Sequence, residues 1–160
     1  MPQFSLQSTS PDQTGDLARA LAAELHAGDV LLLSGPVGAG KSHFARAIVQ
    51  ALCGAETEVP SPTFTLVQPY RANTGPEVLH ADLYRLGDPS ELTELGLDLP
   101  AKDAICLIEW PERLGDGAPA SALSVSLSLT SESNRTLTFS AISPRWADLA
   151  TLLETTSANV

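Results

Sequence analysis

The loop sequence from Gly35 to Ser42 constrains this chain more than any other stretch. It reads GPVGAGKS and fits the pattern G-x-x-x-x-G-K-[ST], the phosphate-binding P-loop. Glycines let the backbone curl so that successive amide N–H groups face one point, where phosphate oxygens can sit. In such a loop the lysine, here Lys41, approaches the β and γ phosphates, and the hydroxyl of Ser42 takes one place on Mg²⁺. The stretch therefore predicts a phosphate site that includes Gly38, Ala39, Gly40, Lys41 and Ser42.

The segments on either side of the loop fit this interpretation. Residues 30–33 form a short apolar run, typical of a parallel strand that is covered on both faces. After the loop, apolar residues recur at helical spacing from Phe44 to Leu52, and Gly54 is placed to end the helix. A chance match to the pattern is the alternative, and a strand before the loop with a helix after it makes that alternative rare.

Composition bounds the size and the compartment. With 160 residues, of which 43% are hydrophobic, the chain can bury one core. We expect one domain over residues 1–154 and a flexible tail over 155–160. The first residues lack a basic and apolar leader pattern, and no apolar run reaches membrane-spanning length, so we expect a cytoplasmic protein without membrane contact.

Cys53 and Cys106 stand far apart and predict buried thiols, not a disulfide or a metal site.

The charge balance argues against direct binding of nucleic acid. The chain has 19 acidic and 9 basic residues, which gives a formal net charge of -10. A surface of this sign repels a phosphate backbone. Lysine occurs only at Lys41 and Lys102, and the first of these belongs to the loop. Any connection to nucleic acid is therefore expected to run through a more basic partner.

The N-terminal periodicities predict a strand and a helix. Phe4 and Leu6 alternate with polar residues, which indicates a short first strand. Residues 17–25 have one apolar helical face that can pack on a sheet, and either Asp12 or Thr14 can cap that helix.

Two hairpins and two further helices complete the predicted fold. The segments 64–70 and 78–83 read as strands joined by a turn, an antiparallel hairpin inserted after the loop helix, and a short acidic helix follows over 88–95. Alternation in 123–129 and 137–141 predicts a second hairpin with one wet face, before a short C-terminal amphipathic helix. We therefore expect a three-layer α/β domain of the P-loop NTPase kind around a mostly parallel central sheet.

A second apolar run supplies the carboxylate that a phosphate site needs. Residues 104–110 read as a buried strand that ends in Glu109 and Trp110. An acid at the C-terminal tip of a strand beside the loop reaches Mg²⁺ directly or through water, and Glu109 has this position. Asp82 is the competing acid. Both can serve, one on the metal and one to orient the attacking water, or either can simply cap the helix that follows.

Two absences narrow the class of ligand. No N-K-x-D sequence follows the loop, so selectivity for guanine is not indicated and ATP is the expected nucleotide. His26, His43 and His80 lack the spacing of metal ligands, so we expect them to be solvated or packed.

Four stretches together resemble the TsaE family of bacterial P-loop ATPases. They are GPVGAGKS, SPTFTLVQPY (61–70), HADLYRL (80–86) and LIEWPERL (107–114), and the resemblance covers roughly residues 14–114. Ser42 stands where the family usually has threonine, which keeps the hydroxyl. Pro36 replaces a common acidic residue.

This resemblance implies an activity and partners. TsaE proteins act with TsaB and TsaD in making threonylcarbamoyladenosine beside the anticodon of tRNA. By this resemblance the chain is expected to be a Mg²⁺-dependent ATPase that its partners stimulate. TsaD transfers the threonylcarbamoyl group, and the partners hold the tRNA. Lys41, Asp82 and Glu109 are then the catalytic residues, and Ser42 and Glu109 hold the metal.

The resemblance also implies further contacts with the nucleotide. Thr14 is expected on the adenine side, and Thr63 is expected to sense the γ phosphate as a switch residue does. Trp110 and Tyr84 either line the nucleotide site or the partner face, or are core aromatics.

Two other functions remain open on the sequence alone. A small-molecule kinase can have this length and this loop, but it needs an acceptor pocket and a lid, commonly rich in arginine. The seven arginines here are scattered. A nucleotide-dependent binding module with almost no turnover is the third possibility.

Overall fold

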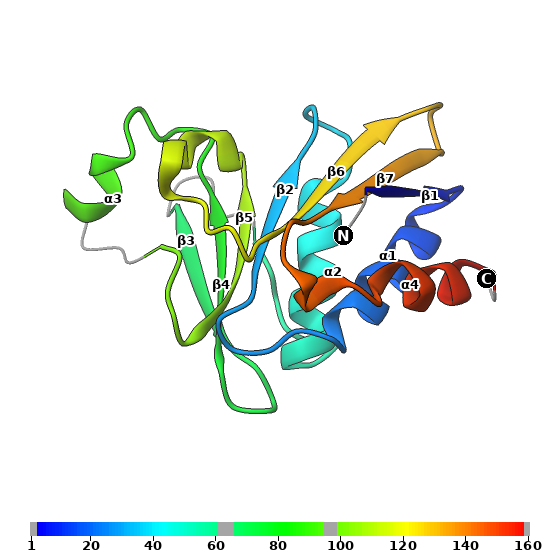
Figure 1. The fold of residues 1–160 in the computed structure, drawn as a ribbon, viewed down its shortest axis with the longest axis horizontal. Helices are drawn as coiled ribbons and strands as arrows, with labels where there is room; N and C mark the ends of the chain where they lie inside the picture. Colours follow the sequence, from blue (N-terminus) through cyan, green and yellow to red (C-terminus); the bar gives the residue numbers. More distant parts are fainter. Residues whose placement is uncertain (1–2, 61–65, 95–98, 159–160) are drawn as a thin grey trace.

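The computed structural model describes residues 3–60, 66–94 and 99–158 and contains one seven-stranded mixed sheet (Figure 1). The strands are β1 (Phe4–Ser8), β2 (Val30–Ser34), β3 (Val67–Arg71), β4 (Glu77–Asp82), β5 (Ala104–Glu109), β6 (Leu123–Leu129) and β7 (Arg135–Ser140). The helices are α1 (Pro11–Ala22), α2 (Lys41–Cys53), α3 (Ser90–Glu94) and α4 (Leu149–Ala158), with 3₁₀ segments η1 (Pro111–Gly117) and η2 (Pro144–Trp146).

The sheet has a parallel centre and antiparallel edges. Its strand order is β1-β7-β6-β2-β5-β4-β3. Strand β2 pairs in parallel with β5 and β6, and β4 pairs in parallel with β5. The β3–β4 and β6–β7 pairs are antiparallel, and β1 adds to β7 in the same sense. Both predicted hairpins are confirmed, and so is the α/β fold with its parallel central strands. Residues 64 and 65, at the start of the first predicted hairpin strand, lie outside the described residues.

Long helices cover one face of the sheet. A buried cluster joins Leu17 of α1, Phe44 of α2 and Leu153 of α4 to inward side chains such as Leu31 of β2 and Val125 of β6. Helix α1 packs against both α2 and α4 (Figure 1). Burial of these apolar faces is the main favourable term in holding the helices on the sheet.

The opposite face has a thinner and smaller cover. Leu92 of α3 and Leu114 of η1 join a second cluster with Leu79 of β4 and Ile108 of β5. The other face of the C-terminal hairpin carries hydroxyls, as the predicted wet face requires: Ser124, Ser126, Ser128, Thr136, Thr138 and Ser140. The third layer therefore extends over β2, β4 and β5.

Three predicted boundaries need correction. Ser10 caps α1, since its side chain accepts a hydrogen bond from the Gln13 N–H, so neither Asp12 nor Thr14 is the cap. Strand β5 ends at Glu109, because the Trp110 backbone turns into the left-handed region. Helix α4 continues to Ala158, so most of the expected tail over 155–160 is helical.

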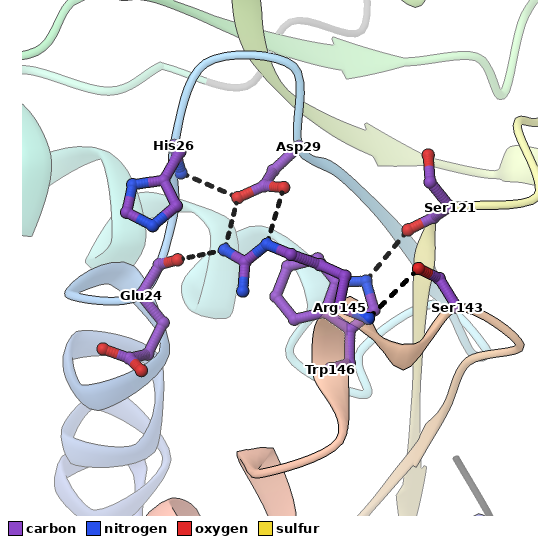
Figure 2. Close-up of polar contacts among 7 residues, drawn as sticks. All are labelled: Glu24, His26, Asp29, Ser121, Ser143, Arg145 and Trp146. Atoms are coloured by element: carbon purple, nitrogen blue, oxygen red, sulfur yellow. Dashed lines mark hydrogen bonds and ion pairs between the residues drawn. The ribbon is translucent and has the colours of Figure 1, made fainter.

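An arginine ties the C-terminal part of the chain to the loop that precedes β2 (Figure 2). The Arg145 guanidinium donates to both carboxylate oxygens of Asp29, at 3.3 and 2.8 Å, and to the carbonyl of Glu24. The buried Trp146 indole beside it donates to the Ser121 carbonyl at 2.9 Å. A bidentate pair of this kind fixes geometry as well as adding energy, so η2 is held against the start of the central strand.

The structure bears on two predictions from composition. Both cysteines are thiols, with Cys106 buried and Cys53 half-buried. Burial raises the pKa of the Cys53 thiol, so it stays protonated near neutral pH. Among the helices that the structure describes, none combines the length and apolar character that crossing a bilayer requires.

Replacing Phe139 with alanine should lower the free energy of unfolding by about 3–5 kcal/mol, since it leaves a cavity in the larger cluster. Phe139 is fully buried and its ring stacks on Phe4 with 4.9 Å between centroids. The same replacement at Leu129, 47% exposed in the same hairpin, should change that free energy by about 0.5 kcal/mol or less. Urea unfolding followed by circular dichroism measures both, and equal losses would contradict the assignment of Phe139 to the core.

Candidate functional site

Strand alternation brings polar side chains to the face of the sheet on which α2 lies. In β4, Val78 belongs to the cluster on that face, so His80 and Asp82 point the same way. In β5, Ile105 belongs to the same cluster, and Glu109 follows it at even spacing. Asp82 and Glu109 are direct partners in the parallel register. The two carboxylates therefore lie at the C-terminal edge of the sheet, where β2 also ends.

The predicted phosphate loop connects β2 to α2, and two of its glycines are required by geometry. At Gly35, with φ 137°, an added Cβ would stand 2.3 Å from the Leu127 carbonyl oxygen, so the loop lies directly against the β6 backbone. Gly40, with φ 104°, forms the N-cap of α2. Side-chain-bearing residues rarely adopt such backbone angles, so the loop shape depends on glycine at both positions.

The start of α2 is open to an anion. Gly40 offers no side chain to cap the helix, and the first turn contains no acidic residue. By contrast, Ser10 caps α1 and Asp12 lies in its first turn. The first amide N–H groups of a helix lack partners within it, and the helix dipole adds positive potential there. Together these features favour a phosphate group at the start of α2.

Lys41 is held within the loop. Its Nζ donates to the Gly35 carbonyl at 2.5 Å and lies 3.7 Å from the centroid of the Trp110 ring. Burial lowers the pKa of the Lys41 ammonium, and the neighbouring Glu109 and Asp82 carboxylates oppose part of that shift. The side chain is 6% exposed, so its positive charge is poorly hydrated and available to a ligand of opposite charge.

Trp110 and Tyr84 stand at the edge of the site. The Trp110 backbone has φ 58° and ψ 52°, an uncommon conformation for a bulky residue, which turns the indole toward Lys41. The ring packs on the smaller apolar cluster and lies 5.0 Å from the Tyr84 ring, at 53° to it. Tyr84 is 50% exposed, so it is not a core aromatic.

Glu109 joins the loop helix to β4. The Ser42 hydroxyl donates to its Oε1 at 3.0 Å, and His80 Nε2 lies 2.7 Å from its Oε2. Glu109 is 2% exposed. Asp82, also buried, accepts a hydrogen bond at Oδ1 from the Tyr84 amide at 3.0 Å. The carboxylate of Glu109 thus contacts the loop helix directly, while Asp82 also supports the turn that follows its strand.

Two adjacent cavities flank the loop. The first, of about 370 Å³, has among its walls most of the predicted site residues: Gly38, Gly40, Lys41, Ser42, Asp82, Glu109 and Trp110. The second, of about 310 Å³, includes the predicted Thr14 and Ala39. Gly40 and His43 line both cavities and form their common wall. Thr63 lies outside the described residues.

Sequence reasoning missed three residues at the site. His80 pairs with Glu109, and its place two residues before Asp82 in a strand was the available signal, since alternate residues share a face. His43 Nε2 lies 3.0 Å from the Pro11 carbonyl. Arg135 of β7 donates from Nε to the Ala39 carbonyl at 3.1 Å, and its distance along the chain gave no signal.

The donor atoms at the loop suit Mg²⁺. Within the described part of the chain no group of three or more His, Cys, Asp or Glu side chains could hold a metal ion. Mg²⁺ is commonly bound by one or two carboxylates together with substrate phosphates and waters, not by a cage of protein ligands. The Ser42 hydroxyl and Glu109 Oε1, 3.0 Å apart, are hard oxygen donors of that kind.

Comparison with known proteins points to one family. A family model described as "Threonylcarbamoyl adenosine biosynthesis protein TsaE" matches residues 8–137. The Bacillus subtilis protein named tRNA threonylcarbamoyladenosine biosynthesis protein TsaE is 34% identical over 147 residues, which are 91% of this chain and 90% of that protein. The protein of the same name from Rickettsia bellii is 38% identical over 126 residues, 79% of this chain and 87% of that protein.

A solved structure agrees with the sequence comparison. The crystal structure of Bacillus subtilis YdiB superposes with a TM-score of 0.74 at 29% identity, covering 96% of this chain and 95% of that one. The residues that the family model matches, 8–137, include the loop, Asp82, Glu109 and the N-terminal part of β7. The chain belongs to the TsaE family.

Proposed function

We propose that this protein binds ATP with Mg²⁺ at the loop and hydrolyses it. The observation that carries the proposal is the uncapped start of α2, with Lys41 buried in the loop above it and the Ser42–Glu109 pair beside it. A triphosphate supplies the anion that the uncapped helix start and Lys41 can accept, and the first cavity has room for it.

The nucleoside would occupy the second cavity. This cavity adjoins the first through Gly40 and His43, so a single extended ligand can enter both. Thr14, expected on the adenine side, lies in its wall, where its hydroxyl is 2.6 Å from the Ser8 hydroxyl. Adenine remains the proposed base, because the chain has no N-K-x-D sequence.

The residues of the first cavity divide the chemistry. Lys41 exchanges its contact with the Gly35 carbonyl for a phosphate oxygen, and its ammonium offsets charge that develops in the transition state. Ser42 and Glu109 would hold Mg²⁺, which supplies charge neutralisation at the β and γ phosphates when bound. Asp82 either orients the attacking water or supports the metal.

The names of the relatives indicate the pathway in which this protein is proposed to act. Proteins of this family are named for tRNA threonylcarbamoyladenosine biosynthesis. We infer that ATP turnover acts on a TsaB–TsaD complex and that tRNA is contacted through those partners. The formal net charge of -10 supports this division, because an acidic surface disfavours direct contact with tRNA.

A small-molecule kinase is less well supported. Among the described residues that line the first cavity there is no arginine, whereas a kinase lid commonly supplies several. Two arginines are engaged away from both cavities, Arg145 with Asp29 and Arg19 with Asp16.

Phosphate release from ATP, with and without a TsaB–TsaD heterodimer, tests the proposed function. The proposal expects slow release by the protein alone and a clear increase with the heterodimer. A kinase would need a small acceptor for phosphate to leave ATP. A binding module would release almost none under either condition, and that result would contradict the proposed ATPase activity.

Replacing Lys41 with alanine should reduce ATP hydrolysis at least about 100-fold, because a preorganised charge at the transferring phosphoryl group is lost. The variant should stay folded. Burial lowers the pKa of the Lys41 ammonium, so keeping this charge buried costs folding free energy in the wild type. The alanine variant has no buried charge at this position and does not carry that cost. Lys102→Ala, at the exposed second lysine, is the matched control and should keep full activity. Hydrolysis that survives in Lys41→Ala would remove the site assignment.

A further inference from the structure

We propose that His80 is a positioning residue for Glu109. Its Nε2–H donates to Glu109 Oε2 and so directs Oε1 toward Ser42 and the metal position. This inference rests on the proposed function, because it assigns His80 a role in metal binding at the same site. The contact concerned is the buried one between His80 and Glu109, on the side of the Glu109 carboxylate away from the loop.

The acceptor chemistry of the carboxylate sets the direction of this hydrogen bond. The two atoms are 2.7 Å apart, and the side chains of His80 and Glu109 are 1% and 2% exposed. An ionised carboxylate only accepts hydrogen bonds, so Nε2 carries the hydrogen. His80 Nδ1 is buried and has no hydrogen-bond partner among the described residues. The imidazole therefore directs its hydrogen-bonding capacity at Glu109.

Stability alone does not account for this pair. Removing two polar groups from water is costly, and buried ion pairs can often be replaced by apolar residues without loss. Two neighbours of His80 on its face of the sheet, Val78 and Leu107, are fully buried and apolar, and Asp82 is the polar neighbour on that face. An apolar residue at position 80 would therefore find apolar contacts. A buried polar atom without a partner, as at Nδ1, adds to the cost. A polar contact kept at such a place indicates a role in the site.

That role follows from how the two oxygens of Glu109 are used. Oε2 is occupied by His80 and Oε1 by the Ser42 hydroxyl, so the plane of the carboxylate is fixed from both sides. Without His80, the Ser42 hydroxyl is the one remaining contact of these two, and the carboxylate can rotate about it, so its plane is no longer fixed. Outer partners of metal-binding groups typically contribute about 10–100-fold to metal affinity.

Binding of Mn²⁺ in the presence of ADP, measured by electron paramagnetic resonance, tests the inference without relying on turnover. His80→Leu should weaken Mn²⁺ binding about 10–100-fold, while the affinity for ADP without metal stays unchanged. His80→Gln places an amide donor near the position of Nε2 and should restore most of the metal affinity. His26→Gln, at an exposed histidine remote from the site, is the control and should match the wild type.

The outcomes separate this inference from the proposed function. Unchanged Mn²⁺ affinity in His80→Leu, or equal loss of metal-free ADP binding, would overturn the positioning role. Absence of nucleotide and metal binding in the wild type would instead overturn the proposed function. Should His80→Leu fail to fold, nitrogen chemical shifts of His80 in the wild type still decide, since an Nε2 without hydrogen is incompatible with donation to Glu109.

Discussion

The parallel register of β2, β5 and β4 is the constraint on which the site depends. Because all three strands run in one direction, their C-terminal ends meet at one edge of the sheet. The loop leaves β2 at that edge, and Asp82 and Glu109 reach it as direct partners. Ligand sites in open α/β sheets lie at this edge for the same reason. A shift of one residue of β5 against β2 would turn Glu109 to the other face and away from Ser42, and a shift of β4 against β5 would turn Asp82 away from Glu109.

Local patterns were enough to predict most of the fold and the centre of the site. Short spacings along the chain predicted the Gly35–Ser42 loop, its flanking strand and helix, and the acid at the end of the 104–109 run. The two hairpins were predicted for the same reason, since the alternation of apolar and polar residues and the turn residues are local signals. The structure brings Lys41, Ser42 and Glu109 together around one cavity.

What the sequence did not predict depends on contacts between distant segments. Thr14 was expected as a possible cap, but the Ser10 side chain takes that place and leaves Thr14 to bond with Ser8. The left-handed turn at Trp110 has no propensity signal, because bulky residues avoid it and tertiary packing enforces it here. His80 looked like a packed or solvated histidine until the pairing of β4 with β5 set it against Glu109.

The position of β2 in the sheet has a consequence for how the protein is made. Both neighbours of β2, the strands β5 and β6, come much later in the chain, and Gly35 lies against the β6 backbone at Leu127. While the ribosome is still adding residues before 104, the strand that carries the loop has no partner on either side. Non-local pairing of this kind is slow to form. In a nascent chain the backbone of β2 therefore lacks its sheet partners until residues of β5 have been added, and an unpaired strand of this kind can pair with other chains.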